Sequence, residues 1–352
     1  MSLLRAGVVG LGTMGRHHVR VLGGMAGVEL VGAADPDPRA RSAARSVPTV
    51  ADLEDLLSLG IDLCVVAAPT LTHTDIGLRL AGAGVHALIE KPLASDADGG
   101  RLLATAFDER GLVGCVGHIE RYNPAVRALR ARLAQGELGS VFQVATRRQG
   151  PFPARIRDVG VVMDLATHDI DLTQWVTGSR YLRVSAFTAR PSGRPHEDLV
   201  AVTGILRDGT ITSHLVNWLS SMKERIVTVT GERGCLLADA LSAELWFHRN
   251  GSVTTGSIPP RHPFRDASEG DLIRYAVAQR EALSVELENF RDAVLGKPAD
   301  IVTLRQGVQT LDVAEAVLAA ARDGRAVDLV ADKIRLARLP EPRRAGGHRV
   351  TR

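Results

Sequence analysis

The feature that most constrains the fold of this 352-residue chain is a glycine pattern placed directly after a short apolar run near the N-terminus. The run AGVVG (6–10) is typical of a buried β-strand, and it leads into Gly10-x-Gly12-x-x-Gly15. Glycines at this spacing let the chain turn sharply into a helix whose first backbone amides can approach a pyrophosphate. The chain has 35 glycines, so the pattern is informative mainly through its position between a strand and a helix. We therefore predict a dinucleotide-binding turn formed by Gly10, Gly12, Thr13, Met14 and Gly15.

An acidic residue at the end of the next apolar segment indicates which dinucleotide would bind. The segment VELVGAAD (28–35) is a second predicted strand, and its last residue, Asp35, follows Gly15 by 20 positions. A carboxylate at this place can accept hydrogen bonds from the adenosine ribose, whereas it would repel a 2′-phosphate. The sequence therefore predicts NAD rather than NADP as the cofactor.

Strand-like and helical segments alternate through the first third of the chain. Three more apolar runs, at 61–69, 85–92 and 111–118, are predicted strands. The segments 51–60 and 74–84, each just before one of these runs, are predicted helices. Strands separated by helices indicate a parallel, doubly wound sheet, in which ligands bind beyond the carboxyl ends of the strands. We therefore predict a dinucleotide-binding Rossmann domain at residues 1–120.

From residue 121 onward this alternation stops. Strand-like segments and two amphipathic helices follow, the strands at 141–149, 182–190, 199–218 and 225–239 and the helices at 283–296 and 309–324. The sequences RDGT and GERG are typical hairpin turns, and the Pro-rich segment 256–270 is a predicted surface loop. These patterns predict an α+β domain for substrate binding and oligomerisation at residues 121–330, with an open, mainly antiparallel sheet. The fold class is therefore α/β, with a Rossmann domain followed by this α+β domain.

The net charge of +3 does not indicate a nucleic-acid-binding protein, because the positive charge is concentrated at the C-terminal end. Residues 331–352 hold seven Lys or Arg and two acidic residues, so this predicted poorly ordered tail carries +5 and the rest of the chain −2. No apolar stretch is long enough to span a bilayer, and no export signal is recognisable. The three cysteines lack metal-ligand spacing and are predicted to be reduced thiols. We expect a cytoplasmic protein without nucleic-acid or membrane partners.

One helical segment of the second domain carries groups that are costly to bury. The stretch DVGVVMDLATHDIDL (158–172) places Asp164, His168 and Asp171 on one face of a helix predicted at 160–175, with Asp169 pointing elsewhere in a structural role. A buried carboxylate and imidazole need partners or a use, and His168 could accept a hydroxyl proton as a general base. The alternative is a satisfied core histidine. No metal site is predicted, because Asp164 and His168 lack a third ligand.

A lysine at the end of a predicted parallel strand is a further candidate for chemistry. The motif EKP (90–92) puts Lys91 at the edge of the sheet where a cofactor would bind, and the following proline favours extended backbone there. This lysine could donate a hydrogen bond to a substrate oxygen and stabilise negative charge that develops on it. Only four of the 43 basic residues are lysines. A lysine at this position therefore favours a functional role over that of an ordinary surface residue.

Four motifs together resemble those of the glucose-fructose oxidoreductase, inositol dehydrogenase and rhizopine catabolism (Gfo/Idh/MocA) family of oxidoreductases. They are the glycine pattern with Asp35, EKP (90–92), GHIERYNP (117–124) and Asp164-x-x-x-His168, and the resemblance extends to Leu329. The stretches GHIERYNPA, RRQGPFPARIRDVGVVMDLATHDIDL and NWLSSMKERIVTVTGERG are similar to nucleotide-sugar 3-dehydrogenases in particular.

The resemblance implies roles for individual residues. Lys91, Asp164 and His168 would form the catalytic centre, and the Lys91–Pro92 bond would often be cis. Cofactor contacts beyond the glycine turn and Asp35 are expected from Pro69, Thr70, His73, Glu90, Lys91 and Pro92. Substrate contacts are expected from His118, Glu120, Arg121, Arg148, Arg157, Asp164, His168 and Trp218.

Two further expectations concern side chains near these motifs. Arginines of the stretch RRQGPFPARIRD, including Arg148, Arg155 and Arg157, are candidates for binding an anionic group such as a diphosphate. His17 and His18 are expected to be surface residues.

The function implied by the resemblance is NAD-dependent oxidation of a ring secondary hydroxyl, the 3-hydroxyl of a nucleotide sugar, by a homodimer or homotetramer. The alternative substrates are an inositol, a free sugar or an aminoglycoside-like pseudosugar. Two other classes stay open, a glycosidase that uses NAD transiently and a dinucleotide sensor without turnover. The sequence leaves undetermined the exact sugar, the physiological direction, the oligomer, the role of the tail and which of Lys91 and His168 is the formal base.

Overall fold

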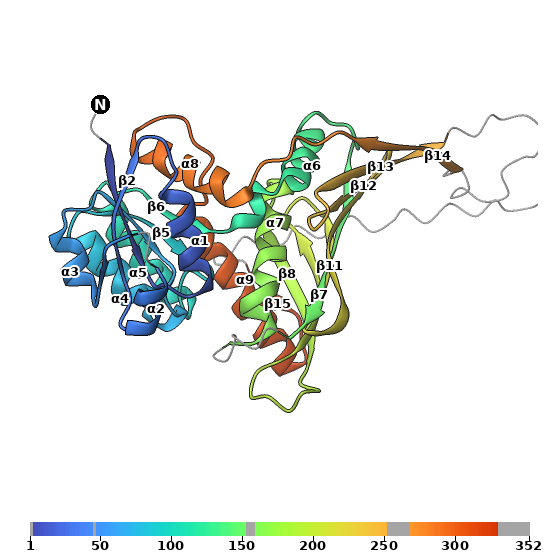
Figure 1. The fold of residues 1–352 in the computed structure, drawn as a ribbon. Helices are drawn as coiled ribbons and strands as arrows, with labels where there is room; N and C mark the ends of the chain where they lie inside the picture. Colours follow the sequence, from blue (N-terminus) through green and yellow to red (C-terminus); the bar gives the residue numbers. More distant parts are fainter. Residues whose placement is uncertain (1–2, 45–46, 153–158, 252–267, 330–352) are drawn as a thin grey trace, which may run out of the picture.

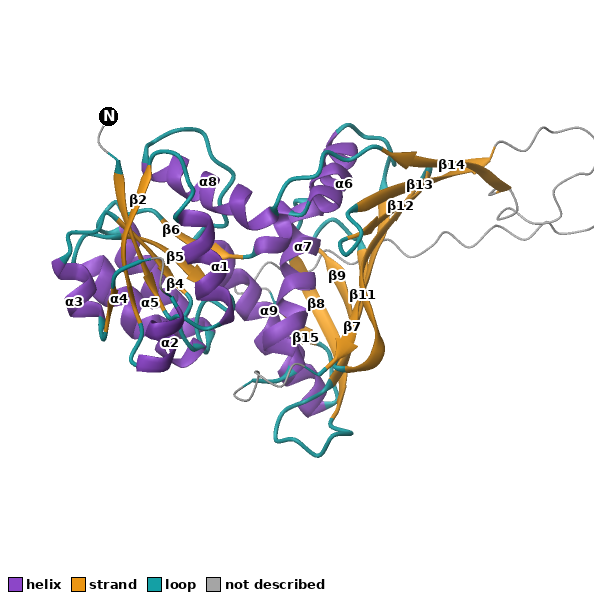
Figure 2. Cartoon of the chain, viewed as in Figure 1, coloured by secondary structure: helices purple, strands orange, loops and turns teal. Residues whose placement is uncertain are grey.

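The computed structural model describes residues 3–44, 47–152, 159–251 and 268–329. These residues form two sheets with helices packed between and around them (Figure 1, Figure 2). None of the helices in the described ranges is long and apolar enough to cross a membrane.

The N-terminal sheet has six parallel strands in the order β3-β2-β1-β4-β5-β6. Its strands are β1 (Leu4–Val9), β2 (Val28–Ala34), β3 (Thr49–Val50), β4 (Leu63–Val66), β5 (His86–Glu90) and β6 (Gly114–Gly117). The helices of this region are α1 (Thr13–Leu22), α2 (Pro38–Ala43), α3 (Leu53–Ser58), α4 (His73–Gly82) and α5 (Ala97–Asp108). The predicted doubly wound parallel sheet is confirmed, although β3, α2 and α5 were not predicted. The strand order reverses between β1 and β4, so a ligand is expected beyond the carboxyl ends of these strands.

The C-terminal sheet has nine strands in the order β14-β13-β12-β11-β7-β10-β9-β8-β15. Its strands are β7 (Val141–Pro151), β8 (Tyr181–Ala189), β9 (Leu199–Leu206), β10 (Ile211–Asn217), β11 (Leu219–Gly231), β12 (Gly234–Asp239), β13 (Glu244–Gly251), β14 (Ser268–Tyr275) and β15 (Val327–Asp328). All neighbouring pairs are antiparallel except β7 and β10, which are parallel. The predicted mainly antiparallel sheet is therefore confirmed, and RDGT and GERG do connect neighbouring strands.

The helices of the C-terminal half lie on one side of this sheet, toward the Rossmann domain (Figure 1). They are α6 (Pro124–Ala134), α7 (Thr167–Thr177), α8 (Ala282–Val294) and α9 (Leu304–Asp323). Short helical turns complete the chain at η1 (Thr70–Thr72), η2 (Ile119–Tyr122) and the π-helix η3 (Val162–Ala166). The predicted loop 256–270 ends earlier than expected, because β14 begins at Ser268. Its residues 256–267, like the tail 331–352, lie outside the described ranges.

Two helices of the C-terminal half pack against the N-terminal domain as well. Leu283, Leu287 and Phe290 of α8 pack in the same apolar cluster as Val19 and Leu22 of α1. Helix α9 contacts both α5 of the Rossmann domain and β8 of the second sheet. The C-terminal part of the chain therefore returns to cover the first domain, and this packing joins the two halves.

Candidate active site

The glycine turn between β1 and α1 is too tight for side chains at two of its three glycines. Gly10 has a φ of 91°, which is the left-handed region, and a Cβ there would lie 2.6 Å from the Ala67 carbonyl oxygen. A Cβ on Gly15 would lie 1.8 Å from the Gly10 oxygen, whereas one on Gly12 would meet nothing within 4 Å. The turn is thus closed on the protein side and open in front of Gly12, where a pyrophosphate can approach the start of α1.

The start of α1 and Asp35 both have capacity left for a dinucleotide. No side chain caps the helix at Gly12, and its first turn holds no acidic residue that would repel a phosphate. Asp35 accepts from the Leu11 amide at 2.7 Å through Oδ2 and from the Asp37 amide at 2.8 Å through Oδ1. Each carboxylate oxygen can accept a second hydrogen bond, so the carboxylate can also bind ribose hydroxyls. The residues present therefore fit NAD.

Three residues of the loop after β4, Pro69, Thr70 and His73, are predicted to contact the cofactor. Pro69 and Thr70 begin η1, next to the carboxyl end of β4. His73 is buried, and its two ring nitrogens lie 2.9 Å from the Ala68 oxygen and 3.0 Å from the Pro92 oxygen. Both nitrogens thus lie at hydrogen-bond distance from main-chain oxygens of the two loops, and the contact of His73 with the cofactor stays a prediction.

Glu90, the last residue of β5, forms a buried pair with His18, which the sequence analysis places at the surface. Its Oε1 lies 2.8 Å from His18 Nε2, and its Oε2 accepts from the Lys91 amide at 3.2 Å. The expectation for His18 is wrong, because this side chain is fully buried, whereas His17 is exposed. Burial raises the pKa of the Glu90 carboxyl, but His18 and Lys91 outweigh it and hold that pKa below its usual range. The Glu90 side chain therefore lies in the protein interior, and its predicted contact with the cofactor stays untested.

Lys91 is held by the helical segment that carries Asp164. The Lys91–Pro92 bond is cis. Lys91 Nζ donates to Asp164 Oδ1 and to the Asp164 carbonyl oxygen, both at 2.8 Å. Asp164 lies in the π-helix η3, so the predicted regular helix 160–175 is wrong in its first turn. Such π-turns are frequent at functional sites, and this one presents both a side-chain and a main-chain oxygen to the lysine.

His168 is a buried imidazole with unused hydrogen-bonding capacity. Its side chain is 8% exposed, and its Nδ1 has no partner in the described part of the chain. Burial lowers the pKa of His168 well below its usual range, and the positive charges of Lys91 and Arg148 lower it further. The ring is therefore neutral at pH 7 and can accept a proton.

A group of buried polar residues, His118, Arg121 and Asp171, lies next to His168. Arg121 donates to both oxygens of Asp171, at 2.7 and 2.6 Å, and His118 Nδ1 lies 4.0 Å from the same carboxylate. The His118 ring is edge-on to that of His168, with centroids 6.3 Å apart. His118 is thus placed beside the candidate base His168, whereas the guanidinium of Arg121 is used within the protein.

Arg148 does not offer its charge to a ligand. It is buried, and its Nη1 donates to Glu120 at 2.7 Å and its Nε to Asp169 at 3.0 Å. Two carboxylates already use its Nη1 and Nε, so this geometry does not support the contact of Arg148 with an anionic group of the substrate, which stays a prediction. Asp169 has the structural role that was expected for it. The ion pair fixes α7, which carries His168, to strand β7.

The other residues predicted to contact the substrate are Trp218, Arg155 and Arg157. Trp218 is buried, with its ring edge-on to Phe152 at 5.4 Å and the Arg194 guanidinium 5.0 Å from its centroid. These contacts do not favour the expected contact of Trp218 with the substrate, because its ring is already covered. Arg155 and Arg157 lie outside the described residues.

One charged residue near Lys91, Asp164 and His168, Arg225, is not predicted from the sequence. Arg225 of β11 lies directly opposite Arg148, and its charge acts on both His168 and Asp164. It belongs to the quoted stretch NWLSSMKERIVTVTGERG, but nothing in the local pattern shows that it faces the site. Only the pairing of β11 with β7, strands far apart in sequence, reveals it.

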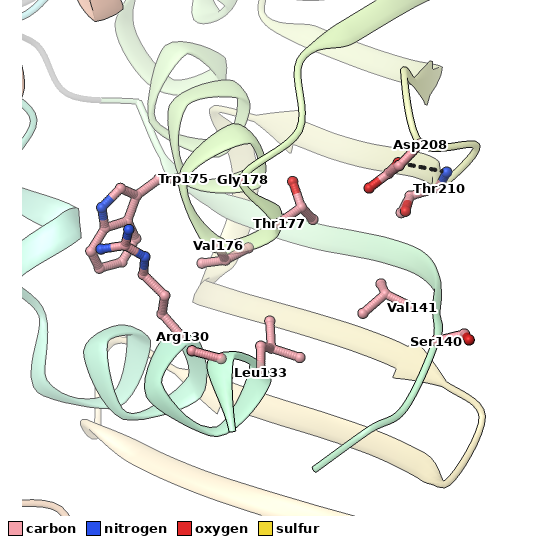
Figure 3. A pocket seen from close by; sticks show the side chains of 11 residues that line it. Arg130, Leu133, Ser140, Val141, Trp175, Val176, Thr177, Gly178, Asp208 and Thr210 are labelled. Atoms are coloured by element: carbon pink, nitrogen blue, oxygen red, sulfur yellow. Dashed lines mark hydrogen bonds between the residues drawn. The ribbon is translucent and has the colours of Figure 1, made fainter. Parts of the chain in front are cut away.

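One cavity in the described part of the chain lies away from the cluster of Lys91, Asp164 and His168. It has a volume of about 480 Å³, and it is lined by residues of α6, the end of α7, β7 and the β9–β10 turn (Figure 3). Arg130 lies over the Trp175 ring there, at 4.3 Å from the centroid. None of the predicted catalytic or cofactor-binding residues lines this cavity, so we do not take it as the active site. In the described residues, no cluster of three or more His, Cys, Asp or Glu side chains is arranged to hold a metal ion.

Two protein-family models match the chain over most of its length. Residues 4–118 match "Oxidoreductase family, NAD-binding Rossmann fold", and residues 130–329 match "Oxidoreductase family, C-terminal alpha/beta domain". Both matches are to the family whose motifs the sequence resembles.

Known dehydrogenases are similar to this chain over most of its length, both in sequence and in structure. The UDP-N-acetylglucosamine 3-dehydrogenase of Acidithiobacillus ferrooxidans is 31% identical over 305 residues, which cover 84% of this chain and 90% of the relative. The scyllo-inositol 2-dehydrogenase (NAD(+)) of Bacillus subtilis is 26% identical over 340 residues, 93% of this chain and 96% of the relative. The crystal structure of GenD2 from gentamicin A biosynthesis in complex with NAD has a TM-score of 0.78 and 27% identity, and covers 94% of this chain and 97% of that chain.

Proposed function

The chain belongs to the Gfo/Idh/MocA family of NAD-dependent oxidoreductases that act on CH–OH groups, and within this family we propose that it oxidises a nucleotide sugar. The reaction would convert a ring secondary hydroxyl, the 3-hydroxyl, to a ketone. The observation that carries the proposal is the cluster of Lys91, Asp164 and His168 beside the carboxyl end of β5, next to a turn that fits NAD. The similarity to a UDP-N-acetylglucosamine 3-dehydrogenase supports the choice of substrate.

In this proposal the protein orients the substrate and moves a proton. The glycine turn and Asp35 would hold NAD, whose nicotinamide supplies the hydride acceptor. Neutral His168 accepts the proton of the substrate hydroxyl. Lys91, fixed by Asp164, donates a hydrogen bond to the same oxygen while negative charge develops on it. The C–H hydrogen leaves as hydride and the O–H hydrogen as a proton, so the product is a ketone.

The experiment that tests the proposal combines a substrate panel with product analysis. The protein is incubated with NAD and either UDP-N-acetylglucosamine, myo-inositol or an aminoglycoside, while NADH absorbance is followed and products are identified by mass spectrometry. A keto nucleotide sugar with an equal amount of NADH is expected. A cleaved glycoside without NADH would instead show a glycosidase, and binding of NAD without any product would show a sensor.

An inositol or pseudosugar is the second candidate substrate class. The inositol dehydrogenase relative of Bacillus subtilis matches a larger share of this chain than the nucleotide-sugar relative does. Arg148, one of the arginines predicted to hold a diphosphate, is also used inside the protein. Oxidation of neutral cyclitols alone in the same panel would establish this second function.

Cofactor choice is expected to depend on Asp35. We predict that kcat/KM is at least about tenfold higher with NAD than with NADP, roughly 1.4 kcal/mol, because the carboxylate repels a 2′-phosphate. Asp35→Ser should narrow this difference. Steady-state rates with both cofactors measure it, and equal use of NADP by the parent protein would falsify the ribose assignment.

Self-association is proposed through the sheet face that points away from the helices. Apolar side chains are exposed on this face, with Phe187 at 79% and Ile211 at 48%. Phe187 and Leu215 both pair with Ala201 of the strand between them, so they lie in one row. An apolar row of this kind on an uncovered sheet is typical of a protein–protein interface.

We expect the protein to be a homodimer or homotetramer, and Phe187→Glu to shift it toward smaller species because a charge would be buried at the interface. Light scattering coupled to size-exclusion chromatography measures the mass. Leu71→Glu, at an exposed position in the Rossmann domain, is the control and should leave the mass unchanged. A parent protein that is monomeric at all concentrations would contradict the proposal.

The proposed setting is the cytoplasm, with a small-molecule sugar as partner and neither nucleic acid nor membrane. The unpaired thiols of Cys64 and Cys115, both buried, support a reducing compartment.

A further inference from the structure

Two arginines of neighbouring strands face the candidate active site from the second sheet. Arg225 of β11 lies directly opposite Arg148 of β7. Residues opposite each other in antiparallel strands share one face of the sheet, and Arg148 contacts Asp169 of α7. Arg225 therefore projects from the face that carries the helices and the catalytic centre.

The two guanidinium groups differ in how their charge is balanced. Arg148 donates to two carboxylates, those of Glu120 and Asp169. Among the described residues no carboxylate lies at ion-pair distance from Arg225, and only its Nη1 is used, donating to the main-chain oxygens of Gln149 at 2.8 Å and Glu224 at 2.7 Å. Its Nε and Nη2 have no partner within the described ranges. Two like charges placed opposite each other disfavour folding, and the open Nε and Nη2 of Arg225 leave one side of its fork free for a ligand.

The surroundings of Arg225 hold charges of both signs. Burial lowers the pKa of Arg225 and the charge of Arg148 lowers it further, whereas the carboxylates of Glu120, Asp169 and Asp164 raise it. Its field reaches Asp164 and His168, so a group bound to it would lie near the reacting centre. Lys223, two residues earlier, adds a second positive charge beside Gly150, whose Cβ would lie 3.6 Å from the lysine Cγ.

We propose that Arg225, with Lys223 beside it, binds an anionic group that the substrate carries away from the oxidised carbon. This inference rests on the proposed nucleotide-sugar dehydrogenase function and assigns the substrate's negative charge to β11 rather than to Arg148. The planar fork of Arg225 can hold two oxygens of a diphosphate or of a carboxylate. Binding at this remote group would help to position the sugar carbon for hydride transfer.

The test compares two variants at the proposed subsite with one on the opposite sheet face. Arg225→Gln and Lys223→Ala remove the charges that the proposal uses. Arg147→Ala is the matched control, because Arg147 adjoins Arg148 on β7, points to the other face and pairs with Glu224 at the surface. Arg225→Lys keeps the charge but loses the fork. NAD affinity and circular dichroism report whether each variant is folded.

Arg225→Gln is expected to weaken UDP-N-acetylglucosamine roughly tenfold or more, both in KM and in binding to the NADH-loaded protein measured by NADH fluorescence. Lys223→Ala should weaken it less, Arg225→Lys should retain part of the affinity, and Arg147→Ala should match the parent. Competition by UDP alone and by glucuronate distinguishes the two sources of the anion. A diphosphate site is blocked by UDP, and a carboxylate site by glucuronate.

The outcomes separate this inference from the function on which it rests. If the parent oxidises UDP-N-acetylglucosamine and Arg225→Gln binds and turns it over equally well, the inference is overturned and the proposed function stands. If the parent neither binds nor oxidises a nucleotide sugar but oxidises myo-inositol, both fail. A loss of NAD affinity in Arg225→Gln as large as the loss of sugar affinity would also overturn the inference, because it would show a general structural role.

Discussion

Lys91→Ala and His168→Ala are each expected to lower kcat by about 10²- to 10⁴-fold while the protein folds and binds NAD. Lys91 is the only group in the described residues that hydrogen-bonds to the Asp164 side chain, and His168 is a buried neutral imidazole with an unused ring nitrogen. In the proposed mechanism, removing either side chain takes away one of the two groups that act on the substrate hydroxyl. Stopped-flow or steady-state measurement of NADH formation gives kcat, and NAD affinity is measured separately by calorimetry.

The controls for these variants are an exposed lysine and an exposed histidine. Lys297→Ala and His248→Ala remove the same side-chain types at solvated positions and should keep the parent kcat. A catalytic variant with near-parental kcat would exclude that residue from the proton path.

The pH profile offers a second readout of the same pair. Because the pKa of His168 is lowered in the folded protein, its base form persists below pH 6.5, and kcat/KM should fall only at more acidic pH. The apparent value belongs to the coupled pair of Lys91 and His168 rather than to one of them. An acid limb centred above pH 6.5 would contradict the assignment of His168 as the base.

Arg148→Ala is expected to destabilise the protein by about 3–5 kcal/mol, the usual cost of removing one partner from a buried ion pair. The substitution leaves the carboxylates of Glu120 and Asp169 without their cation, and Asp169 is almost fully buried on α7. Because α7 also carries His168, kcat should fall together with stability. Chemical denaturation followed by circular dichroism measures the change in the free energy of unfolding.

The neighbouring arginine again supplies the control. Arg147→Ala removes a half-exposed ion pair with Glu224, which keeps its hydrogen bond from Gln149, and should cost no more than about 1 kcal/mol. The double variant Arg148→Ala/Asp169→Ala should lose less stability than the two single losses added together, since each single change leaves a charge unpaired. A stable Arg148→Ala variant that had lost only its affinity for nucleotide sugars would restore the original substrate-binding prediction.

Most of the local architecture followed from patterns along the chain. The glycine turn is recognisable because Gly10 must adopt a positive φ and Gly15 leaves no space for a Cβ, requirements that a short stretch of sequence expresses. The alternation of strands and helices predicted the parallel sheet, and the hairpin turns predicted the antiparallel one. Strands β13 and β14 were missed, because polar and charged residues interrupt their apolar pattern.

The partners of the buried charges could not be predicted in this way. Glu90 meets His18 across 72 residues of sequence, and the carboxylates that neutralise Arg148 come from η2 and α7. Whether an arginine donates to two carboxylates, like Arg148, or only to main-chain oxygens, like Arg225, depends on strand register and helix docking. Periodicity and backbone preferences act over a few residues and therefore appear in the sequence, whereas electrostatic pairing acts through space and is set only when distant segments pack together.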